Sequence, residues 1–279
     1  MLKSQSGNSL GIVAICKNEE KDIEGFLKNV YKLANEIVIV DDGSTDNTLE
    51  KIRNFNSDIR IINTRMGKEG YAGLRNEGIK KIGTEWVLSM DIDERITPEL
   101  YREIKLNINK NEFVAFKFKR LNFFLNHKVK YGGWGSWNHH QLARRKFHYF
   151  EGVIHEKVII TNFGELKIGQ LKSVMWHLGD SYYNERVLKS LNYSKAEASK
   201  KNNYEKKITG ARIFYAFAKE LIKNFIFKRG FLDGTIGVIT ALHSADSVFR
   251  TYTYLWENKN SIKRNEIEKI LSRKWGNNE

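Results

Sequence analysis

The chain has 279 residues, of which 41% are hydrophobic, enough for one large α/β domain with an extension or for two small domains, which argues against global disorder. Lysine and arginine outnumber aspartate and glutamate by 47 to 33, and the net charge of +14 favours anionic partners such as nucleic acid, anionic lipid or an acidic substrate. The single cysteine, Cys16, excludes an internal disulfide and fits a reducing compartment.

No targeting or membrane-spanning segment is recognisable along the chain. The apolar stretch that ends at Cys16 is too short for a secretory signal and lacks a small-residue cleavage pattern. No uncharged apolar run approaches the length needed to span a bilayer, so we expect a cytoplasmic protein. Nucleic acid is not expected as a partner, because the sequence has neither a metal-binding Cys/His spacing nor an aromatic RNA-binding signature. The alternative is that the positive charge serves solubility.

Strands and helices are predicted to alternate from residue 11 to residue 90. Short, largely β-branched runs predict buried strands, and segments with apolar residues at helical spacing predict the helices between them. Ser44 or Thr45 is expected to cap the second helix. Such alternation implies right-handed parallel crossovers and a doubly wound sheet. The predicted strands are Gly11–Cys16, Glu36–Val40, Asp58–Ile62 and Glu85–Met90, and the helices are Glu19–Leu33, Thr48–Phe55 and Ala72–Ile82.

The rest of the chain is predicted to add an acceptor-side region and a helical extension. Thr97 and Pro98 suit the N-cap and first position of a helix over Glu99–Ile108. The partly alternating run Phe113–Phe124 predicts a strand, and the pattern after Trp176 turns helical. We therefore expect an α/β domain over residues 1–180 and a helical region over residues 181–279.

Three polar clusters directly follow three of the predicted strands. They are Lys17–Glu19, Asp41–Ser44 and Asp91–Glu94. Because ligands bind beyond the carboxyl ends of the strands in open α/β sheets, these clusters should gather on one rim. Asp91 and Asp93 can then both reach one hard divalent cation, Mg²⁺ or Mn²⁺, which would stabilise the charge on a diphosphate leaving group. The alternative is a solvated acidic turn that caps the next helix.

Several longer motifs resemble a known family. IVAICKNEE, IVIVDDGSTDNT, GLRNEGI and EWVLSMDIDE, in this order and spacing, are similar to family 2 glycosyltransferases of the GT-A fold. WNHHQLARR, GVIHEKV, MWHLGDSYYNERVLKSLNYSKAEA and FIFKRGFLDGTIGV resemble the branch that includes lipopolysaccharide core β-glucosyltransferases. The resemblance covers Gly11 to Glu257. It implies an α/β, GT-A (Rossmann-like), mostly parallel sheet flanked by helices, with a helical C-terminal extension. It also implies that residues 1–180 form the nucleotide-sugar-binding and catalytic domain.

The resemblance also implies roles for residues near the donor nucleotide. Ala14, Asn18 and Glu19 would line the nucleotide, mostly through backbone groups. Asp42 would contact the base or ribose, because a carboxylate accepts hydrogen bonds from a uracil N–H or a hydroxyl. Arg75 would pair with a phosphate. The alternatives are a local turn bond for Asp42 and an exposed helix charge for Arg75.

Metal binding is assigned by the same resemblance to three residues. Asp93 is the expected direct ligand, and Asp91 would face the donor sugar or ribose while contributing to the metal site. His177 would supply a further metal or phosphate contact, since imidazole tolerates Mn²⁺ well. The alternative for His177 is a buried structural histidine beside Trp176.

An inverting transfer needs a base that takes the proton of the acceptor hydroxyl. The motif GVIHEKV places Glu156 at the matching position of the family, with Glu94 and Asp180 as competitors. His155 would orient the acceptor or serve as a structural histidine. The tandem His139-His140 and the nearby GGWGSW loop would contact the acceptor.

Cys16 and the glycine-containing turns argue against other enzyme classes. Cys16 has no histidine partner on its strand, so it is expected to be a small core residue rather than a nucleophile. The turns match neither GxGxxG nor a Walker loop, which excludes a typical dinucleotide enzyme or NTPase.

The basic C-terminal region leaves two interpretations open. The apolar stripe within Ile213–Phe227, flanked by lysines, fits a helix packed on the catalytic domain, which we favour, or a helix lying on an anionic membrane surface. Gly234–Trp256 is similarly apolar, but His243, Asp246 and Arg250 make it a poor spanning helix.

Together these patterns predict a metal-dependent, inverting hexosyltransferase. Its donor would be a nucleotide-diphosphate sugar, expected to be a UDP-sugar. Its acceptor would be a hydroxyl of a cell-envelope saccharide or glycolipid such as lipopolysaccharide core. The alternatives are a protein or peptide acceptor, or a non-catalytic sugar-binding protein that kept the fold. Intact Asp91, Asp93 and Glu156 argue against the non-catalytic alternative.

Overall fold

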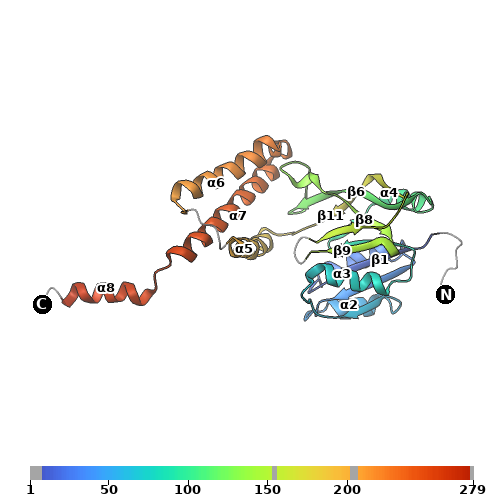
Figure 1. Cartoon of the computed structure of the whole chain (residues 1–279), viewed down its shortest axis with the longest axis horizontal. Coiled ribbons are helices and arrows are strands. Elements are labelled where there is room, and N and C mark those ends of the chain that lie inside the picture. Colours follow the sequence, from blue (N-terminus) through green and yellow to red (C-terminus); the bar gives the residue numbers. More distant parts are fainter. Residues whose placement is uncertain (1–7, 153–155, 202–206, 277–279) are drawn as a thin grey trace. The chain divides into compact units, whose positions relative to one another are not determined.

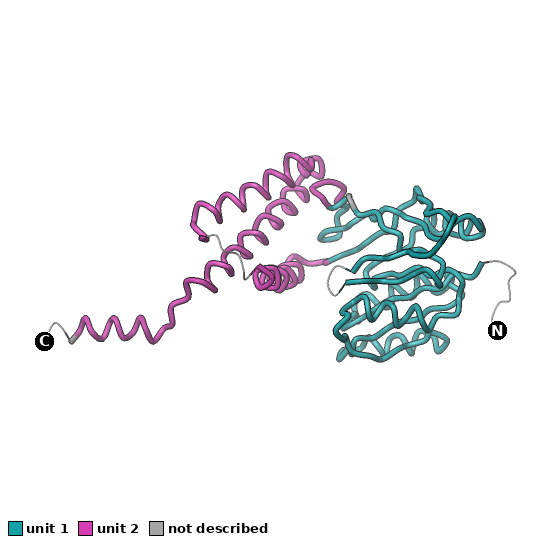
Figure 2. The backbone as a smooth tube through the Cα atoms, in the orientation of Figure 1, with its two compact units in different colours: residues 1–128, 134–179 teal, residues 129–133, 180–279 magenta. Residues whose placement is uncertain are grey.

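The structure is a computed structural model that describes residues 8–152, 156–201 and 207–276 (Figure 1). The chain forms two compact units, one of residues 1–128 and 134–179 and one of residues 129–133 and 180–279 (Figure 2). His155, predicted to orient an acceptor, lies outside the described residues.

The first unit is built on one mixed sheet. Its described strands have the order β3-β2-β1-β4-β8-β6-β11-β5, with β7 paired to β6. β3, β2, β1 and β4 run parallel, as the alternation of strands and helices predicted, whereas β8 pairs antiparallel with both β4 and β6. The strands are β1 Leu10–Cys16, β2 Glu36–Asp41, β3 Arg60–Asn63, β4 Trp86–Asp91, β5 Glu94–Ile96, β6 Phe113–Phe124, β7 His127–Val129, β8 Asn138–Arg144 and β11 Lys167–His177, beside a separate hairpin of β9 His148–Glu151 and β10 Lys157–Ile160.

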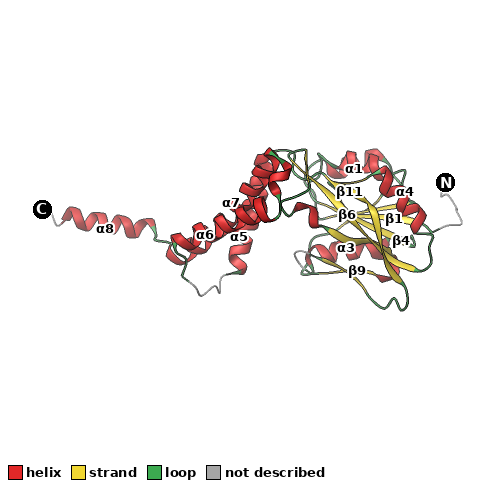
Figure 3. Cartoon of the chain, turned by 90° about the horizontal axis from the view of Figure 1, so that it is seen from above, coloured by secondary structure: helices red, strands yellow, loops and turns green. Residues whose placement is uncertain are grey.

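Helices cover both faces of this sheet, which is why its central strands are apolar on both sides. Leu27 of α1 and Ile104 of α4 pack with Ile12 on one face, while Ile79 of α3 packs with Val13 on the other. Figure 3 shows α1 and α4 on one side of the strands and α3 with β9 on the other. The helices of the unit are α1 Ile23–Val30, α2 Thr48–Phe55, α3 Gly70–Lys81 and α4 Pro98–Asn107.

Helix starts were predicted with mixed success. Thr97 does cap α4, because its side chain accepts a hydrogen bond from the Leu100 N–H, and Pro98 occupies the first turn. The prediction that Ser44 or Thr45 caps α2 is wrong. The N-cap is Asn47, and the Ser44 hydroxyl donates instead to the buried Asp41 carboxylate. α1 begins at Ile23 rather than at Glu19, because residues 19–22 form a separate turn.

The second unit is helical, as predicted for the C-terminal extension. α5 (Tyr183–Lys200) and α6 (Gly210–Ile222) each pack against the long α7 (Thr235–Asn260). A π-helical turn, η3 (Lys223–Phe227), and a 3-10 turn, η4 (Gly230–Asp233), join α6 to α7, and α8 (Arg264–Gly276) follows. None of the helices in the described part of the chain is both long and apolar enough to cross a bilayer.

Close packing of α3 on the sheet predicts a sensitivity at Gly78. A Cβ there would lie 2.5 Å from Val13 Cγ1 and 3.0 Å from Val40 Cγ2. We expect Gly78→Ala to lower the free energy of unfolding by about 1–3 kcal/mol through overpacking, measured by urea denaturation. Gly67→Ala is the control, because nothing lies within 4 Å of a Cβ at that position. Equal midpoints for the two variants would contradict this packing.

Candidate active site

The polar clusters after β1, β2 and β4 meet at one edge of the sheet. β1 lies between β2 and β4, with Cys16 opposite Asp41 and Ile15 opposite Asp91. The three strands therefore end at the same level, and the residues that follow them share one rim. The predicted convergence of the three clusters is confirmed.

The buried Asp41 fixes the turn after β2, and Asn18 links the turn after β1 to it. The Asp41 carboxylate accepts hydrogen bonds from the N–H groups of Gly43, at 2.9 Å, and Ser44, at 3.0 Å. Gly43 has a φ of 75°, a left-handed conformation that glycine adopts without strain. Asn18 then ties the first turn to the second, since its N–H donates to Ser44 Oγ and its Oδ1 accepts from the Thr45 N–H at 2.7 Å.

Asp42 is buried and joins three strand ends. Its Oδ1 accepts from the Met66 N–H at 2.6 Å, and its Oδ2 accepts from Lys17 Nζ at 2.9 Å. Burial alone would raise the pKa of Asp42, but Lys17, the Met66 N–H and Arg65 hold that pKa below its usual range. Met66 follows β3, and the segment after this strand is not among the three predicted clusters. The strand-end rule applied there would have found this segment.

Ala14 and Glu19 differ in their access to a ligand. Ala14 lies inside β1 between β2 and β4 and is fully buried, so it has no surface for a nucleotide, and we leave it out of the proposed site. Glu19 lies in the turn after β1, where its N–H donates to Thr48 Oγ1 at 2.8 Å.

Arg75 is buried at 4% exposure and connects two of the predicted site carboxylates. Its Nη2 donates to Asp91 Oδ1 at 2.5 Å and its Nε to Glu156 Oε1 at 2.9 Å, while Nη1 donates to Ser89 Oγ at 2.9 Å. Burial alone would lower the pKa of Arg75, but the two carboxylates raise that pKa above its usual value. The alternative of an exposed helix charge is therefore wrong. The guanidinium supports two acids here, and the predicted phosphate contact stays a prediction.

Asp91 keeps its charge because of this arrangement. Burial would raise the pKa of Asp91, yet Arg75, His177 and Arg120 together lower it. The Asp91 side chain is nevertheless 36% exposed, so part of its carboxylate faces the rim.

Asp93 and His177 form a second pair on the same rim. His177 Nε2 lies 3.1 Å from Asp93 Oδ2, and His177 Nδ1 lies 2.9 Å from Asn122 Oδ1. The Leu178 N–H donates to the Asp93 carbonyl, which holds the end of β11 against the turn after β4. Two predicted metal ligands far apart in the sequence are thus adjacent, and both remain partly exposed.

The two competitors for the role of base have structural partners. Glu94 is fully buried, its Oε2 accepts from the Asp91 N–H at 2.9 Å, and its Oε1 lies 3.3 Å from Arg120 Nη1. Burial and the charge of Asp91 raise the pKa of Glu94 to about 7, against the opposing effect of Arg120. Asp180, in the second unit, pairs with Lys189 at 2.6 Å and Arg186 at 3.6 Å.

Comparison with known proteins decides the family. The sequence model described as Glycosyl transferase family 2 matches residues 11–162, more than half of the chain. The chain belongs to glycosyl transferase family 2. An uncharacterized glycosyltransferase of Rickettsia conorii is 25% identical over 253 residues, which cover 87% of this chain and 88% of the relative. The lipopolysaccharide core biosynthesis glycosyltransferase LpsC of Rhizobium meliloti is 25% identical over 260 residues, covering 87% of this chain and 93% of LpsC.

Solved structures similar to this family 2 glycosyltransferase include two sugar-nucleotide complexes. A mannosyltransferase of Pyrobaculum calidifontis in complex with GDP-Man and Mn²⁺ matches with a TM-score of 0.49 and 14% identity, covering 91% of this chain and 88% of that one. Residues 1–349 of S. aureus TarS in complex with UDP-GlcNAc match with a TM-score of 0.44 and 15% identity, covering 90% of this chain and 91% of that one.

The side chains on the rim of this family 2 glycosyltransferase fit a divalent ion whose remaining ligands come from a substrate. Within the described ranges of the chain, no three His, Cys, Asp or Glu side chains are grouped so as to hold a metal by themselves. Asp93 and His177 nevertheless offer an oxygen and a nitrogen side by side, with the part-exposed Asp91 nearby. Mg²⁺ commonly binds one or two carboxylates and takes its other ligands from water and substrate phosphates. Asp93 with a diphosphate would give such a set, and the His177 imidazole would suit Mn²⁺.

The acceptor assignments at residues 132–140 stay predictions. The GGWGSW loop contains a 3-10 turn, Trp134–Ser136, and the His139 ring lies 4.9 Å from the Trp137 ring. His140 Nε2 lies 3.0 Å from the Val158 carbonyl, a structural contact.

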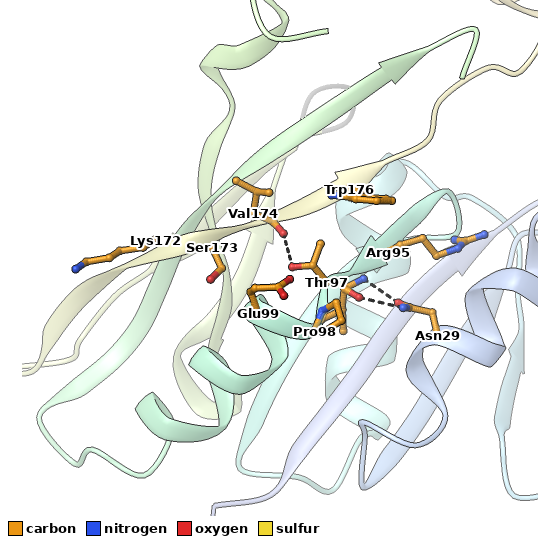
Figure 4. A pocket seen from close by; sticks show the side chains of 10 residues that line it. Asn29, Arg95, Thr97, Pro98, Glu99, Lys172, Ser173, Val174 and Trp176 are labelled. Carbon is orange, nitrogen blue, oxygen red and sulfur yellow. Dashed lines mark hydrogen bonds between the residues drawn. The ribbon is translucent and has the colours of Figure 1, made fainter. Parts of the chain in front are cut away.

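A separate groove of about 530 Å³ lies where β5, β11 and the start of α4 meet (Figure 4). Trp176 lines this groove. Trp176 and His177 are consecutive in β11, so their side chains point to opposite faces of the sheet, and the groove is not part of the rim described above. Asn29, Thr97 and Glu99 line it as well.

Removal of the Arg75 guanidinium should strongly destabilise the first unit. Arg75→Met leaves Asp91 and Glu156 without their shared partner in a largely buried place, and we expect a loss of about 3–5 kcal/mol in the free energy of unfolding. Arg102→Met is the matched control, since that exposed Arg102–Glu99 pair should contribute under about 1 kcal/mol. Urea denaturation of both variants measures the difference, and similar losses would contradict a structural role for Arg75.

Proposed function

We propose that this family 2 enzyme transfers a sugar from a UDP-sugar to a hydroxyl of a cell-envelope saccharide or glycolipid, such as lipopolysaccharide core, with inversion at the anomeric carbon. Support for the acceptor class comes from the similarity to LpsC, which covers almost the whole of both chains. The single observation that carries the proposal is the convergence of three strand-end clusters around Asp91, Asp93 and His177.

The donor would lie across the ends of β1, β2 and β4. The turn that contains Asn18 and Glu19 would contact the nucleotide. Asp42 would lie beside the base or ribose, and its two oxygens, which accept hydrogen bonds from Lys17 and Met66, hold this surface in a fixed conformation. Lys17 has a side chain 56% exposed and adds positive charge at the same edge. Such an edge suits an anionic diphosphate.

Asp93 and His177, with Asp91 beside them, would hold Mg²⁺ or Mn²⁺ against the diphosphate. When bound, the ion would offset the negative charge that develops on the leaving diphosphate. Two contacts hold these residues in position. Asn122 Oδ1 contacts the His177 ring, and the Glu94 carboxylate accepts a hydrogen bond from the Asp91 N–H. Both limit the freedom of the ligands before the substrate arrives.

Glu156 is the proposed base. A single displacement needs a carboxylate that takes the proton from the acceptor hydroxyl on the side opposite the diphosphate. Glu156 keeps 16% of its side chain exposed, and its Oε1 is held by Arg75, which also holds Asp91. One buried guanidinium thereby places the proposed base beside the end of β4, where the donor sugar would lie.

A panel assay tests this function directly. The enzyme is incubated with UDP-, GDP- and ADP-sugars and a lipopolysaccharide-core acceptor, with Mn²⁺ or chelator. Release of the nucleotide is measured, and NMR determines the anomeric configuration of the sugar transferred to the acceptor. We expect metal-dependent turnover of a UDP-sugar and an inverted anomeric centre. Retention of configuration, or turnover that chelation leaves unchanged, would contradict the proposed mechanism.

The proposed glycolipid acceptor implies that the transfer takes place at a membrane surface. We place the enzyme on the inner face of the plasma membrane as a peripheral protein, since a glycolipid acceptor is embedded there and the chain carries a net charge of +14.

A further inference from the structure

The turn between α6 and α7 exposes an unusual number of large apolar side chains. We call residues 222–232 the hairpin tip, which comprises the end of α6, η3 and the beginning of η4 (Figure 1). Phe227 is 78% exposed, more than any other apolar side chain in the described part of the second unit. Four further large apolar residues of the tip are about half exposed, namely Ile222, Ile226, Phe231 and Leu232.

Positive charge accompanies these apolar side chains. Lys223, Lys228 and Arg229 lie within the hairpin tip, and the tip sequence contains no acidic residue. Over residues 180–279 the chain has 19 lysines and arginines against 11 aspartates and glutamates, so the helical unit holds more than half of the net charge of +14. Apolar side chains mixed with Lys and Arg are typical of surfaces that lie in the headgroup layer of an anionic membrane.

The hairpin tip is a fixed structure and not a frayed helix end. The Gly132 N–H donates to the Lys228 carbonyl at 2.9 Å, and Asp233 Oδ2 accepts from the N–H groups of Lys130 and Tyr131. Gly230 and Gly237 allow close backbone contacts that a Cβ would block. Because the backbone is held on both sides, the exposure of Phe227 and its neighbours is built into the fold.

We propose that the hairpin tip inserts its apolar side chains into the interface of an anionic bilayer, while Lys228 and Arg229 bind lipid phosphates. Lys223 is already paired with Glu220 at 2.6 Å. A second copy of the chain is a poorer occupant, because two tips facing each other would bring Lys228 and Arg229 of one copy against the same two cations of the other, while Glu220 is already paired with Lys223. The inference gives the proposed glycolipid transfer a route to its acceptor, and so it rests on the proposed function. Its binding test nevertheless does not require catalysis.

Vesicle flotation of the full chain measures the binding. We expect the protein to float with vesicles of phosphatidylcholine and phosphatidylglycerol, to stay unbound with phosphatidylcholine alone, and to lose binding as salt screens the charges. Equal binding to both vesicles, or binding to neither, would overturn the inference.

Matched variants locate the contact. Phe227→Ser should weaken binding to the anionic vesicles about tenfold, whereas Leu188→Ser, at a site on α5 that is 62% exposed, should not. The double variant Lys228→Gln, Arg229→Gln should weaken binding about thirtyfold, and the charge-matched Lys195→Gln, Lys200→Gln on α5 by clearly less. If the tip variants bind like their controls, another surface holds the membrane and the inference is wrong.

Insertion can be observed at one labelled residue, because the native Cys16 does not compete for a thiol label. Cys16 is buried, and burial, with the nearby Asp41, raises the pKa of its thiol. An environment-sensitive NBD label on Phe227→Cys should shift to the blue with anionic vesicles, while the same label on Leu188→Cys should not. A label that shifts without vesicles as protein concentration rises would show self-association and overturn the inference. Metal-dependent UDP binding, measured on the same samples, separates the two proposals: if UDP binds and vesicles do not, only the membrane inference fails.

Discussion

Asp93→Ala should lower turnover by about 10³-fold, the loss expected when a metal site on a leaving diphosphate is broken. In this structure Asp93 and His177 lie 3.1 Å apart on the rim, and no third His, Cys, Asp or Glu among the described residues completes their set. Asp93 is the carboxylate proposed to contact the ion directly, whereas Asp91 is already paired with Arg75, so the ion should be lost when Asp93 is removed. Calorimetry with UDP should also show that added Mn²⁺ no longer improves binding to the variant.

A control separates the metal from the loss of charge in general. Glu99→Ala removes an exposed carboxylate at the start of α4, in the groove away from the rim, and should leave turnover within about twofold. Full turnover by Asp93→Ala with a working donor would show that the metal assignment is wrong. A folded variant that binds UDP but does not respond to Mn²⁺ is the result our account requires.

Glu156→Gln should lower turnover by about 10²- to 10⁴-fold and leave donor affinity unchanged. Glutamine keeps the size of the side chain and an oxygen that can accept the Arg75 Nε–H, so the bridge to Asp91 can persist. The amide cannot take a proton from the acceptor hydroxyl. Single-turnover kinetics with saturating UDP-sugar should therefore show a slow transfer step, while calorimetry shows normal donor binding.

Glu94→Gln and Asp180→Asn test the two competitors for the same role. The side chain of Glu94 is fully buried and that of Asp180 is 7% exposed, against 16% for Glu156, so both are less accessible to an acceptor hydroxyl. We expect both variants to retain more turnover than Glu156→Gln. Weakened donor binding with normal turnover in Glu156→Gln would instead remove Glu156 as the base.

The rim could be predicted from the sequence because its elements are local. Runs such as Gly11–Cys16 and Glu36–Val40 are apolar on both faces, and the polar residues that follow each run mark where the strand ends. Parallel pairing then brings these ends to one level, as the register of Cys16 with Asp41 confirms. The helix from Pro98 was likewise specified by its cap and proline.

Contacts between distant segments could not be predicted in the same way. Arg75 lies 81 residues from Glu156 in the sequence, and no local pattern indicates that one guanidinium binds both Glu156 and Asp91. The same holds for Glu94 with Arg120, which meet because β11 pairs with β5 on one side and with β6 on the other. Ala14 was placed at the ligand by its motif, whereas its pairing on both sides buries it completely.

The most direct measurement of the central claim is the position of Mn²⁺ in crystals grown with UDP, located by its anomalous scattering. We predict one peak that is coordinated by Asp93, by His177 and by the diphosphate, with the nucleotide across the turns after β1 and β2. A diphosphate bound elsewhere, or a manganese peak that does not contact Asp93, would contradict the account.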